Sequence, residues 1–200
     1  RGFIVTGRIT DSAGQPVTDA QVKELNNSGT RRQVTKTADD GAFILQGLSQ
    51  YESYQGRKPE LNADGSTTIR GLIGLGKPGV DLVVQADGFA PQKQSVRLLG
   101  PTNIVHLVLA PGKIFRGRVL DEVGEPIANA VVRTDSDNNG LRPFEWMAHT
   151  DASGRFVWDS APAEPVLFWF EAEGYEWRRD ISLTAAKQDH EIRLKRKAAK

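Results

Sequence analysis

Hydrophobic and polar residues alternate in many short segments of the chain, and no window of about a dozen residues carries an apolar stripe at helical spacing. The segment 80–86 (VDLVVQA) is apolar at every second position, which predicts a strand with one buried face. The segment 166–172 (VLFWFEA) repeats this pattern with larger side chains. Short clusters of Asp, Gly and Pro, which favour turns, separate such segments. The pattern therefore predicts an all-β protein built from β-sandwiches.

The alternation also assigns faces to these strands. One set should point into a core: Val80, Leu82, Val84 and Ala86 in the first strand, and Val166, Phe168, Phe170 and Ala172 in the second. Trp169 lies on the opposite face of the second strand and should point away from its own core. Trp158 alternates with Phe156 and should point inward.

The chain contains the same unit twice. The stretch GRITDSAGQPVTDAQV (7–22) aligns without a gap on GRVLDEVGEPIANAVV (117–132). The later motifs follow in the same order: TADDGAF and TDASGRF, VQADGF and FEAEGY, HLVL and EIRL. A duplication of this length predicts two sandwiches, 1–111 and 112–200. The join LAPGK is too short to act as a free tether, so the sandwiches should lie close together.

The first copy carries an insert, at about 49–75, that the second copy lacks. Within it, NADGSTTIRGL partly repeats TADDGAFILQGL. Either stretch could therefore supply the central hairpin of the first sandwich.

The repeated motifs, in this order, resemble the carboxypeptidase regulatory-like domain, in two tandem copies that cover nearly the whole chain. The resemblance implies a transthyretin-like (prealbumin-like), seven-stranded immunoglobulin-like sandwich for each copy, related to starch-binding-like, carbohydrate-binding folds. It also implies a setting, because such domains are mostly non-catalytic accessory modules of exported, surface or periplasmic proteins.

Four aromatic residues of the second copy are candidates for a ligand-binding face. Trp169 should point outward, while Tyr175, Trp177 and Trp146 lie in or beside turns. Exposed aromatic rings of this kind stack on sugar rings or on the side chains of a partner. The alternative is that Trp169 packs against the first copy or under the loop 141–147.

The stretch DSDNNG (135–140) has oxygen-bearing side chains at alternate positions and a glycine for a sharp turn, as in the first half of a calcium loop. The candidate ligands are Asp135, Asp137, Asn139 and Glu145. Glu145 lies one place early for the bidentate glutamate of an EF-hand, and the flanks are predicted strands. A solvated turn is the alternative reading, and calcium is the one cofactor that the sequence suggests.

No catalytic site is expected. His106, His149 and His190 stand outside any zinc-protease motif, and the chain has no cysteine nucleophile. The first strand of each copy offers arginine and no lysine, which argues against the internal isopeptide bond of related sandwiches.

Charge and hydropathy restrict the partners. The 26 basic and 25 acidic residues give a net charge of +1, so no global field favours nucleic acid, and no apolar run approaches the roughly 18 residues of a membrane span.

A chain that begins on a strand is expected to be part of a longer one, with any signal or anchor outside this segment. We therefore expect an accessory module of an exported or cell-envelope protein, located extracellularly, at the cell surface or in the periplasm. It should act as a spacer or protein-interaction domain, with neighbouring domains or a protein as partner. The alternative is a module that binds glycan or calcium through its second domain.

Overall fold

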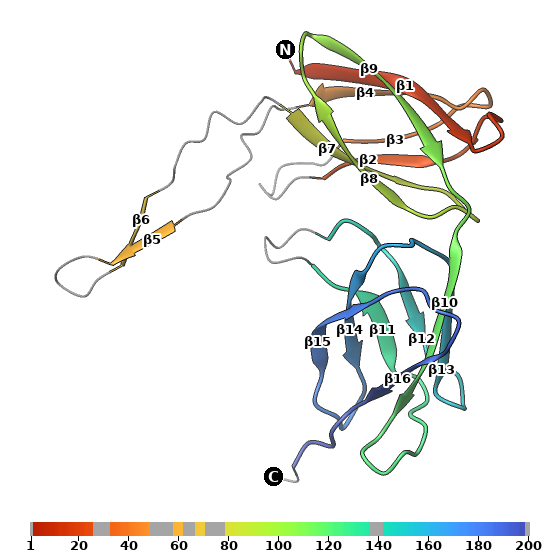
Figure 1. Ribbon diagram of the computed structural model, residues 1–200, viewed down its shortest axis with the longest axis vertical. Helices are drawn as coiled ribbons and strands as arrows, with labels where there is room; N and C mark the ends of the chain where they lie inside the picture. Colours follow the sequence, from red (N-terminus) through yellow and green to blue (C-terminus); the bar gives the residue numbers. More distant parts are fainter. Residues whose placement is uncertain are drawn as a thin grey trace.

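The computed structural model describes residues 2–25, 33–48, 58–61, 67–70, 79–136 and 142–198, with only the backbone described for 58–61 and 67–70. All regular elements in these ranges are β-strands, and four of the five sheets pair into two sandwiches that lie end to end (Figure 1). The N terminus lies at the top of the figure and the C terminus at the bottom. The predicted fold class, two tandem all-β sandwiches, is confirmed.

The N-terminal sandwich consists of a three-stranded sheet, in the order β4-β1-β9, and a four-stranded sheet, in the order β3-β2-β7-β8. Strand β1 pairs antiparallel with β4 but parallel with β9, its last strand. The strands are β1 (Phe3–Asp11), β2 (Gln21–Leu25), β3 (Val34–Lys36), β4 (Ala42–Leu48), β7 (Gly79–Gln85), β8 (Gln92–Arg97) and β9 (Thr102–Leu109).

The C-terminal sandwich repeats this plan, with sheets β13-β10-β16 and β12-β11-β14-β15. Strand β10 again pairs antiparallel with β13 and parallel with the last strand, β16. The strands are β10 (Lys113–Leu120), β11 (Val131–Thr134), β12 (Met147–His149), β13 (Arg155–Ala161), β14 (Val166–Glu171), β15 (Arg178–Leu183) and β16 (His190–Arg193).

The repeated motifs form the same turns in both sandwiches. The hydroxyl of Thr37 accepts the backbone N–H of Ala20 and donates to the carbonyl of Val17, and Thr150 makes the equivalent pair of bonds. Gly41 and Gly154 both have positive φ, and a Cβ at either would overlap a carbonyl oxygen of the first strand. TADDGAF therefore occupies the place of TDASGRF. The remaining strands of the insert, β5 (Lys58–Leu61) and β6 (Thr67–Arg70), form a separate two-stranded sheet.

Each sandwich has its own core, formed by the inward positions of its strands. Val80, Leu82 and Val84 are buried in the first core, and Ala86 packs against it. Phe168, Phe170 and Trp158 are buried in the second, where Phe168 stacks on Phe115 at a centroid distance of 4.6 Å. The predicted faces of these strands are thus observed.

The junction between the sandwiches is held on both sides. Ala110 accepts the N–H of Ala90 at 2.9 Å, and the N–H of Gly112 donates to Gly88 at 3.0 Å, so the connection is fastened to the β7–β8 turn. A Cβ at Gly112 would overlap the backbone of Ser160, at the end of β13. The chain therefore passes from β9 to β10 between two fixed surfaces.

Candidate functional site

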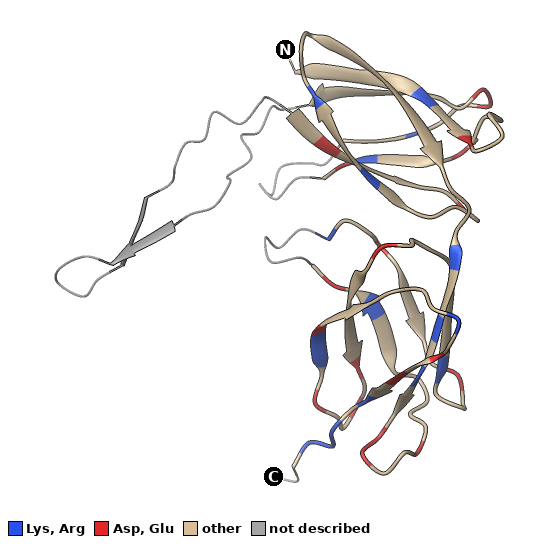
Figure 2. Ribbon diagram, viewed as in Figure 1, with Lys and Arg blue, Asp and Glu red and all other residues tan. Residues whose placement is uncertain are grey.

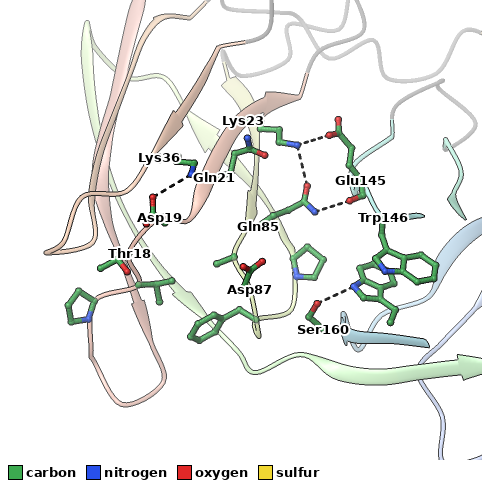
Figure 3. Close-up of a pocket in the computed structure, with 16 residues that line it drawn as sticks. Thr18, Asp19, Gln21, Lys23, Lys36, Gln85, Asp87, Glu145, Trp146 and Ser160 are labelled. Atoms are coloured by element: carbon green, nitrogen blue, oxygen red, sulfur yellow. Dashed lines mark hydrogen bonds and ion pairs between the residues drawn. The ribbon is translucent and has the colours of Figure 1, made fainter. Parts of the chain in front are cut away.

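A cleft of about 840 Å³ lies between the two sandwiches. Lys23 of β2 and Glu145 of the C-terminal sandwich meet across it, and Asp87 of the β7–β8 turn also lines it (Figure 3). The cleft is therefore lined by residues of both sandwiches.

The N-terminal wall of the cleft is the outer face of the four-stranded sheet. A row of three polar residues crosses this face. Gln21 of β2 lies opposite Lys36 of β3 on one side and opposite Gln85 of β7 on the other. Residues that are directly opposite in antiparallel strands project from the same face. The row thus presents one ammonium group and two amides to the C-terminal sandwich.

The C-terminal wall of the cleft is aromatic. Trp146 stacks on Trp158, with centroids 5.0 Å apart and planes 11° apart, and Phe168 meets Trp146 edge-on. The indole N–H of Trp158 donates to the hydroxyl of Ser160 at 3.2 Å, which also lines the cleft (Figure 3). The wall is therefore anchored in the C-terminal core.

Charged groups in the cleft are mostly paired with each other. The ammonium of Lys23 lies 2.7 Å from a carboxylate oxygen of Glu145, and its side chain is only 13% exposed. Lys36 pairs with Asp19 at 3.4 Å. Gln85 contacts both members of the Lys23–Glu145 pair, at 3.5 Å and 3.4 Å, so its amide is held only weakly.

Two of the four predicted aromatic residues come together on the outer face of the C-terminal sandwich. Trp169 stacks on Trp177 at 5.3 Å, and the guanidinium of Arg133 lies 4.2 Å from the centre of the Trp169 ring. The guanidinium of Arg179 lies 5.1 Å from the same ring. Trp177 remains 53% exposed, so it supplies the accessible aromatic surface of this Trp169–Trp177 cluster.

The other two predicted aromatics lie elsewhere. Trp146 packs on the core and faces the cleft, and Tyr175 packs on the core beneath the guanidinium of Arg196, at 5.6 Å. The outward orientation of Trp169 agrees with the prediction, and its neighbours among the described residues include Trp177, Arg133 and Arg179. The four aromatics as one binding face stay a prediction.

The predicted calcium ligands fall into three groups. Asp135 is buried. Its Oδ2 lies 3.3 Å from the Nε of Arg179 and accepts a hydrogen bond from the backbone N–H of Asp180 at 3.2 Å. Glu145 pairs with Lys23, and Asp137 and Asn139 lie outside the described residues. Across the described ranges, no three His, Cys, Asp or Glu side chains gather as a metal site would require. The calcium site stays a prediction.

Another charged contact fastens the C-terminal segment. Asp121 is 2% exposed, and burial alone would raise its pKa. Hydrogen bonds from the N–H groups of Glu125 and Val123 and from the guanidinium of Arg196 outweigh burial and hold the pKa below its ordinary value. The same contact raises the pKa of Arg196. This pair lies outside the cleft.

Sequence reasoning missed the N-terminal wall of the cleft. Gln21 and Gln85 are polar positions between buried ones, which predicts only that they face away from their own core. No pattern along the chain indicates that a second sandwich faces them. The one available signal was the short join, which predicted that the sandwiches lie close together.

Comparison with protein families supports one part of the resemblance. Residues 114–195 match the family described as the carboxypeptidase regulatory-like domain. These residues are the C-terminal sandwich almost from end to end, which supports that family for this sandwich. No curated protein matches the sequence.

Solved structures match this chain only at low similarity. A streptococcal ancillary pilin is 10% identical with a TM-score of 0.44; the alignment covers 98% of this chain and 63% of the pilin. Shaft pilin SpaA from Lactobacillus rhamnosus GG is 11% identical with a TM-score of 0.35, covering 98% of each chain. The Bacillus anthracis TIE protein is 15% identical with a TM-score of 0.33, covering 97% of this chain and 34% of that one. Similarity at this level carries no argument about function.

The described part of the chain contains no helix long and apolar enough to cross a membrane.

Proposed function

We propose that this chain is a non-catalytic accessory module that acts as a spacer, holding its neighbours apart at a set distance and angle. One observation carries the proposal: the first and last strands of each sandwich are parallel. The chain therefore enters each sandwich at one end and leaves at the other. Two sandwiches placed end to end then add their lengths, as Figure 1 illustrates.

The junction supports a fixed angle between the sandwiches. The connection is hydrogen-bonded to Gly88 and Ala90 on one side, and Gly112 lies against Ser160 on the other. The Lys23–Glu145 contact adds a second attachment away from this connection. Two separated attachments restrain rotation better than a flexible linker, which would leave the angle free.

The proposal includes a family and a setting for the whole chain. The N-terminal sandwich shares strand order and turn chemistry with the C-terminal sandwich, so we assign it as a second carboxypeptidase regulatory-like domain. Such domains are mostly modules of exported or cell-surface proteins, and we place the parent protein there. Cleavage by a protease added to intact cells tests this location.

Spin-label distances test the spacer. The chain has no cysteine, so Asp39→Cys and Glu173→Cys, both in exposed turns, place one label on each sandwich. Pulsed electron paramagnetic resonance should give one narrow distance distribution. Insertion of a Gly-Ser segment between Pro111 and Gly112 should broaden it.

A matched pair of variants separates the two attachments. Lys23→Ala removes the contact with Glu145 and should broaden the distribution, whereas Lys36→Ala removes an ion pair within the N-terminal sandwich and should not. A distribution in the unmodified junction as broad as that of the insertion variant would rule out the spacer.

A second candidate function is ligand binding by the C-terminal sandwich. It is favoured by the exposure of Trp177, whose ring lies against Trp169 and is therefore preorganised as a flat surface. A sugar ring stacks on such a surface through its C–H face. Intrinsic tryptophan fluorescence during titration with a panel of polysaccharides tests it: Trp177→Ala should abolish a saturable change, and Val123→Ala, at an exposed turn, should not.

A further inference from the structure

We propose that the cleft between the sandwiches binds a short, neutral, hydroxyl-rich oligosaccharide that contacts both sandwiches at once. The site is separate from the Trp169–Trp177 cluster, because it lies between the sheets and uses the N-terminal sandwich for half of its wall. Its volume, about 840 Å³, falls within the ~300–1,000 Å³ of ordinary ligand sites, which form preferentially between domains.

The amide row supplies groups that recognise hydroxyls. Each glutamine side chain carries two N–H donors and a carbonyl acceptor, which suits a hydroxyl that both donates and accepts. The side chain of Gln21 makes no hydrogen bond within the described residues, and that of Gln85 makes only the long contacts with Lys23 and Glu145. Both amides are therefore available for a ligand in the cleft.

The opposite wall supplies an apolar surface. Trp146 and Trp158 both line the cleft and stack on each other at a nearly parallel angle of 11°. An indole held in one orientation by a second ring offers C–H contact without a further loss of side-chain freedom. A sugar ring has polar edges and an apolar face, so a cleft with amides on one side and an indole on the other matches both.

The charges of the cleft favour a neutral ligand. It contains two ammonium groups, Lys23 and Lys36, and three carboxylates, Asp19, Asp87 and Glu145. Two of the carboxylates are neutralised by the lysines. Asp87 has no ion-pair partner within the described residues, and it would repel an acidic sugar while accepting hydrogen bonds from hydroxyls.

Binding in this cleft would couple the two sandwiches. A ligand held by Gln21 and Gln85 on one side and by Trp146 and Ser160 on the other adds a third attachment between the two existing ones. Bound ligand would then narrow the distribution of distances between the two spin labels without changing either sandwich.

Calorimetric titration of the full chain with maltotetraose, cellotetraose, xylotetraose and chitotetraose, each alone, tests the proposal. At least one probe should bind saturably, and amide NMR shifts should appear in both sandwiches, at Gln21 and Gln85 and around Trp146 and Ser160. The double variant Gln21→Ala, Gln85→Ala should weaken binding at least tenfold. A tetramer of galacturonate should bind more weakly than the neutral probes.

Two controls distinguish binding in the cleft from binding elsewhere and from a loss of folding. Gln46→Ala removes an exposed glutamine of β4, outside the cleft, and should leave the affinity unchanged. If the midpoints of urea unfolding, followed by fluorescence and by circular dichroism, are unchanged, the double variant still folds. The proposal is overturned if no neutral probe binds at millimolar concentration, or if binding survives the double variant and disappears with Trp177→Ala. Loss of sugar binding would leave the label distances of the free chain unaltered, so this proposal and the spacer fail separately.

Discussion

The same face of the same sheet differs between the two sandwiches. On the outer face of the four-stranded sheet, the N-terminal sandwich pairs Lys23 with Val83, and the C-terminal sandwich pairs Arg133 with Trp169 at the equivalent places. The first pair belongs to the face that borders the cleft, and the second forms a layer of aromatic rings and guanidinium groups. One strand plan therefore supports a polar wall in one copy and an aromatic surface in the other.

The outer face of the three-stranded sheet differs as well. In the C-terminal sandwich, Asp189 lies between Arg116 and Arg155, at 2.6 Å and 3.1 Å. By the repeat alignment, Ile104 occupies the place of Asp189 and is 72% exposed. Figure 2 shows the basic positions along β10 of this sheet.

The inward positions, in contrast, are alike. Both cores contain the same turn threonine and the same buried strand positions, enlarged from aliphatic to aromatic in the second copy. The lesson is that the fold is specified by the residues that the copies share, whereas the outer faces are where the copies differ.

The largest expected effect tests whether the two cores are independent. Phe168→Ala should destabilise the C-terminal sandwich by about 3–5 kcal/mol, and Leu82→Ala, at the equivalent position, should destabilise the N-terminal one by about 2–5 kcal/mol. All four tryptophans lie in the C-terminal sandwich, so fluorescence during urea unfolding reports on that sandwich alone. Circular dichroism reports on both.

Phe168→Ala should therefore move the fluorescence midpoint, and Leu82→Ala should move only a dichroism transition. If Leu82→Ala moves the fluorescence midpoint as far as Phe168→Ala does, the two sandwiches unfold as one unit.

The next effect tests the turn that the copies share. Thr37→Val and Thr150→Val each remove a hydroxyl that satisfies a buried N–H and a buried carbonyl. Each change should cost about 1–3 kcal/mol of unfolding free energy, because both backbone groups lose their partner. Thr→Ser at either site keeps the hydroxyl and should recover most of the loss. If the loss of unfolding free energy differs widely between Thr37→Val and Thr150→Val, the shared turn does not stabilise the two sandwiches equally.

One contribution to the pH dependence of the C-terminal sandwich should come from Asp121. The pKa of Asp121 is held below its ordinary value when folded, so its contribution is fully present above about pH 4 and is lost as pH falls through the lower, folded value. The fluorescence midpoint in urea should therefore decline below pH 4, and Asp121→Asn should flatten the decline. Asp11 is at the equivalent place without a guanidinium contact among the described residues, so Asp11→Asn is the matched control. An equal pH slope in the wild type and Asp121→Asn would contradict this account.

The smallest expected effect on stability comes from exchanging a residue between the outer faces of the two three-stranded sheets. Asp189→Ile gives the C-terminal sandwich the residue of the N-terminal one, and it should change stability by less than about 1 kcal/mol because the ion pairs are exposed. High salt should reduce the difference further. Ile104→Asp should be equally well tolerated. A loss of several kcal/mol in either variant would mean that these outer faces also specify the fold.

The strands and their faces could be predicted because alternation is a local signal. Alternation predicts that Val80, Leu82 and Val84 face the core, and they are buried there. It also predicts that Trp169 faces outward, and Trp169 lies between the buried positions of β14. The turn motifs predicted the duplication because Gly41 and Gly154 must adopt positive φ at the same step of each copy.

The cleft could not be predicted because it depends on how the sandwiches are placed. Val83 shows the limit: the alternation places it on the outer face of β7, opposite Lys23, yet it is only 2% exposed. Trp146 lies in the segment before β12, and no local pattern predicts that it packs on Trp158 and forms a wall of the cleft. The angle that creates the cleft is set at Gly112 and Ser160, where no periodic pattern exists.

The parallel pairing of the terminal strands has a mechanical consequence. A tension along the chain would pull β1 and β9 in opposite directions along their length, so their register pairs would be loaded together in shear and not opened one at a time. Eight such pairs join β1 to β9, from Ile4 to Asp11, and four join β10 to β16, from Gly117 to Leu120. Under load, the C-terminal sandwich should therefore give way first and lengthen the chain, while the N-terminal sandwich still bears the force.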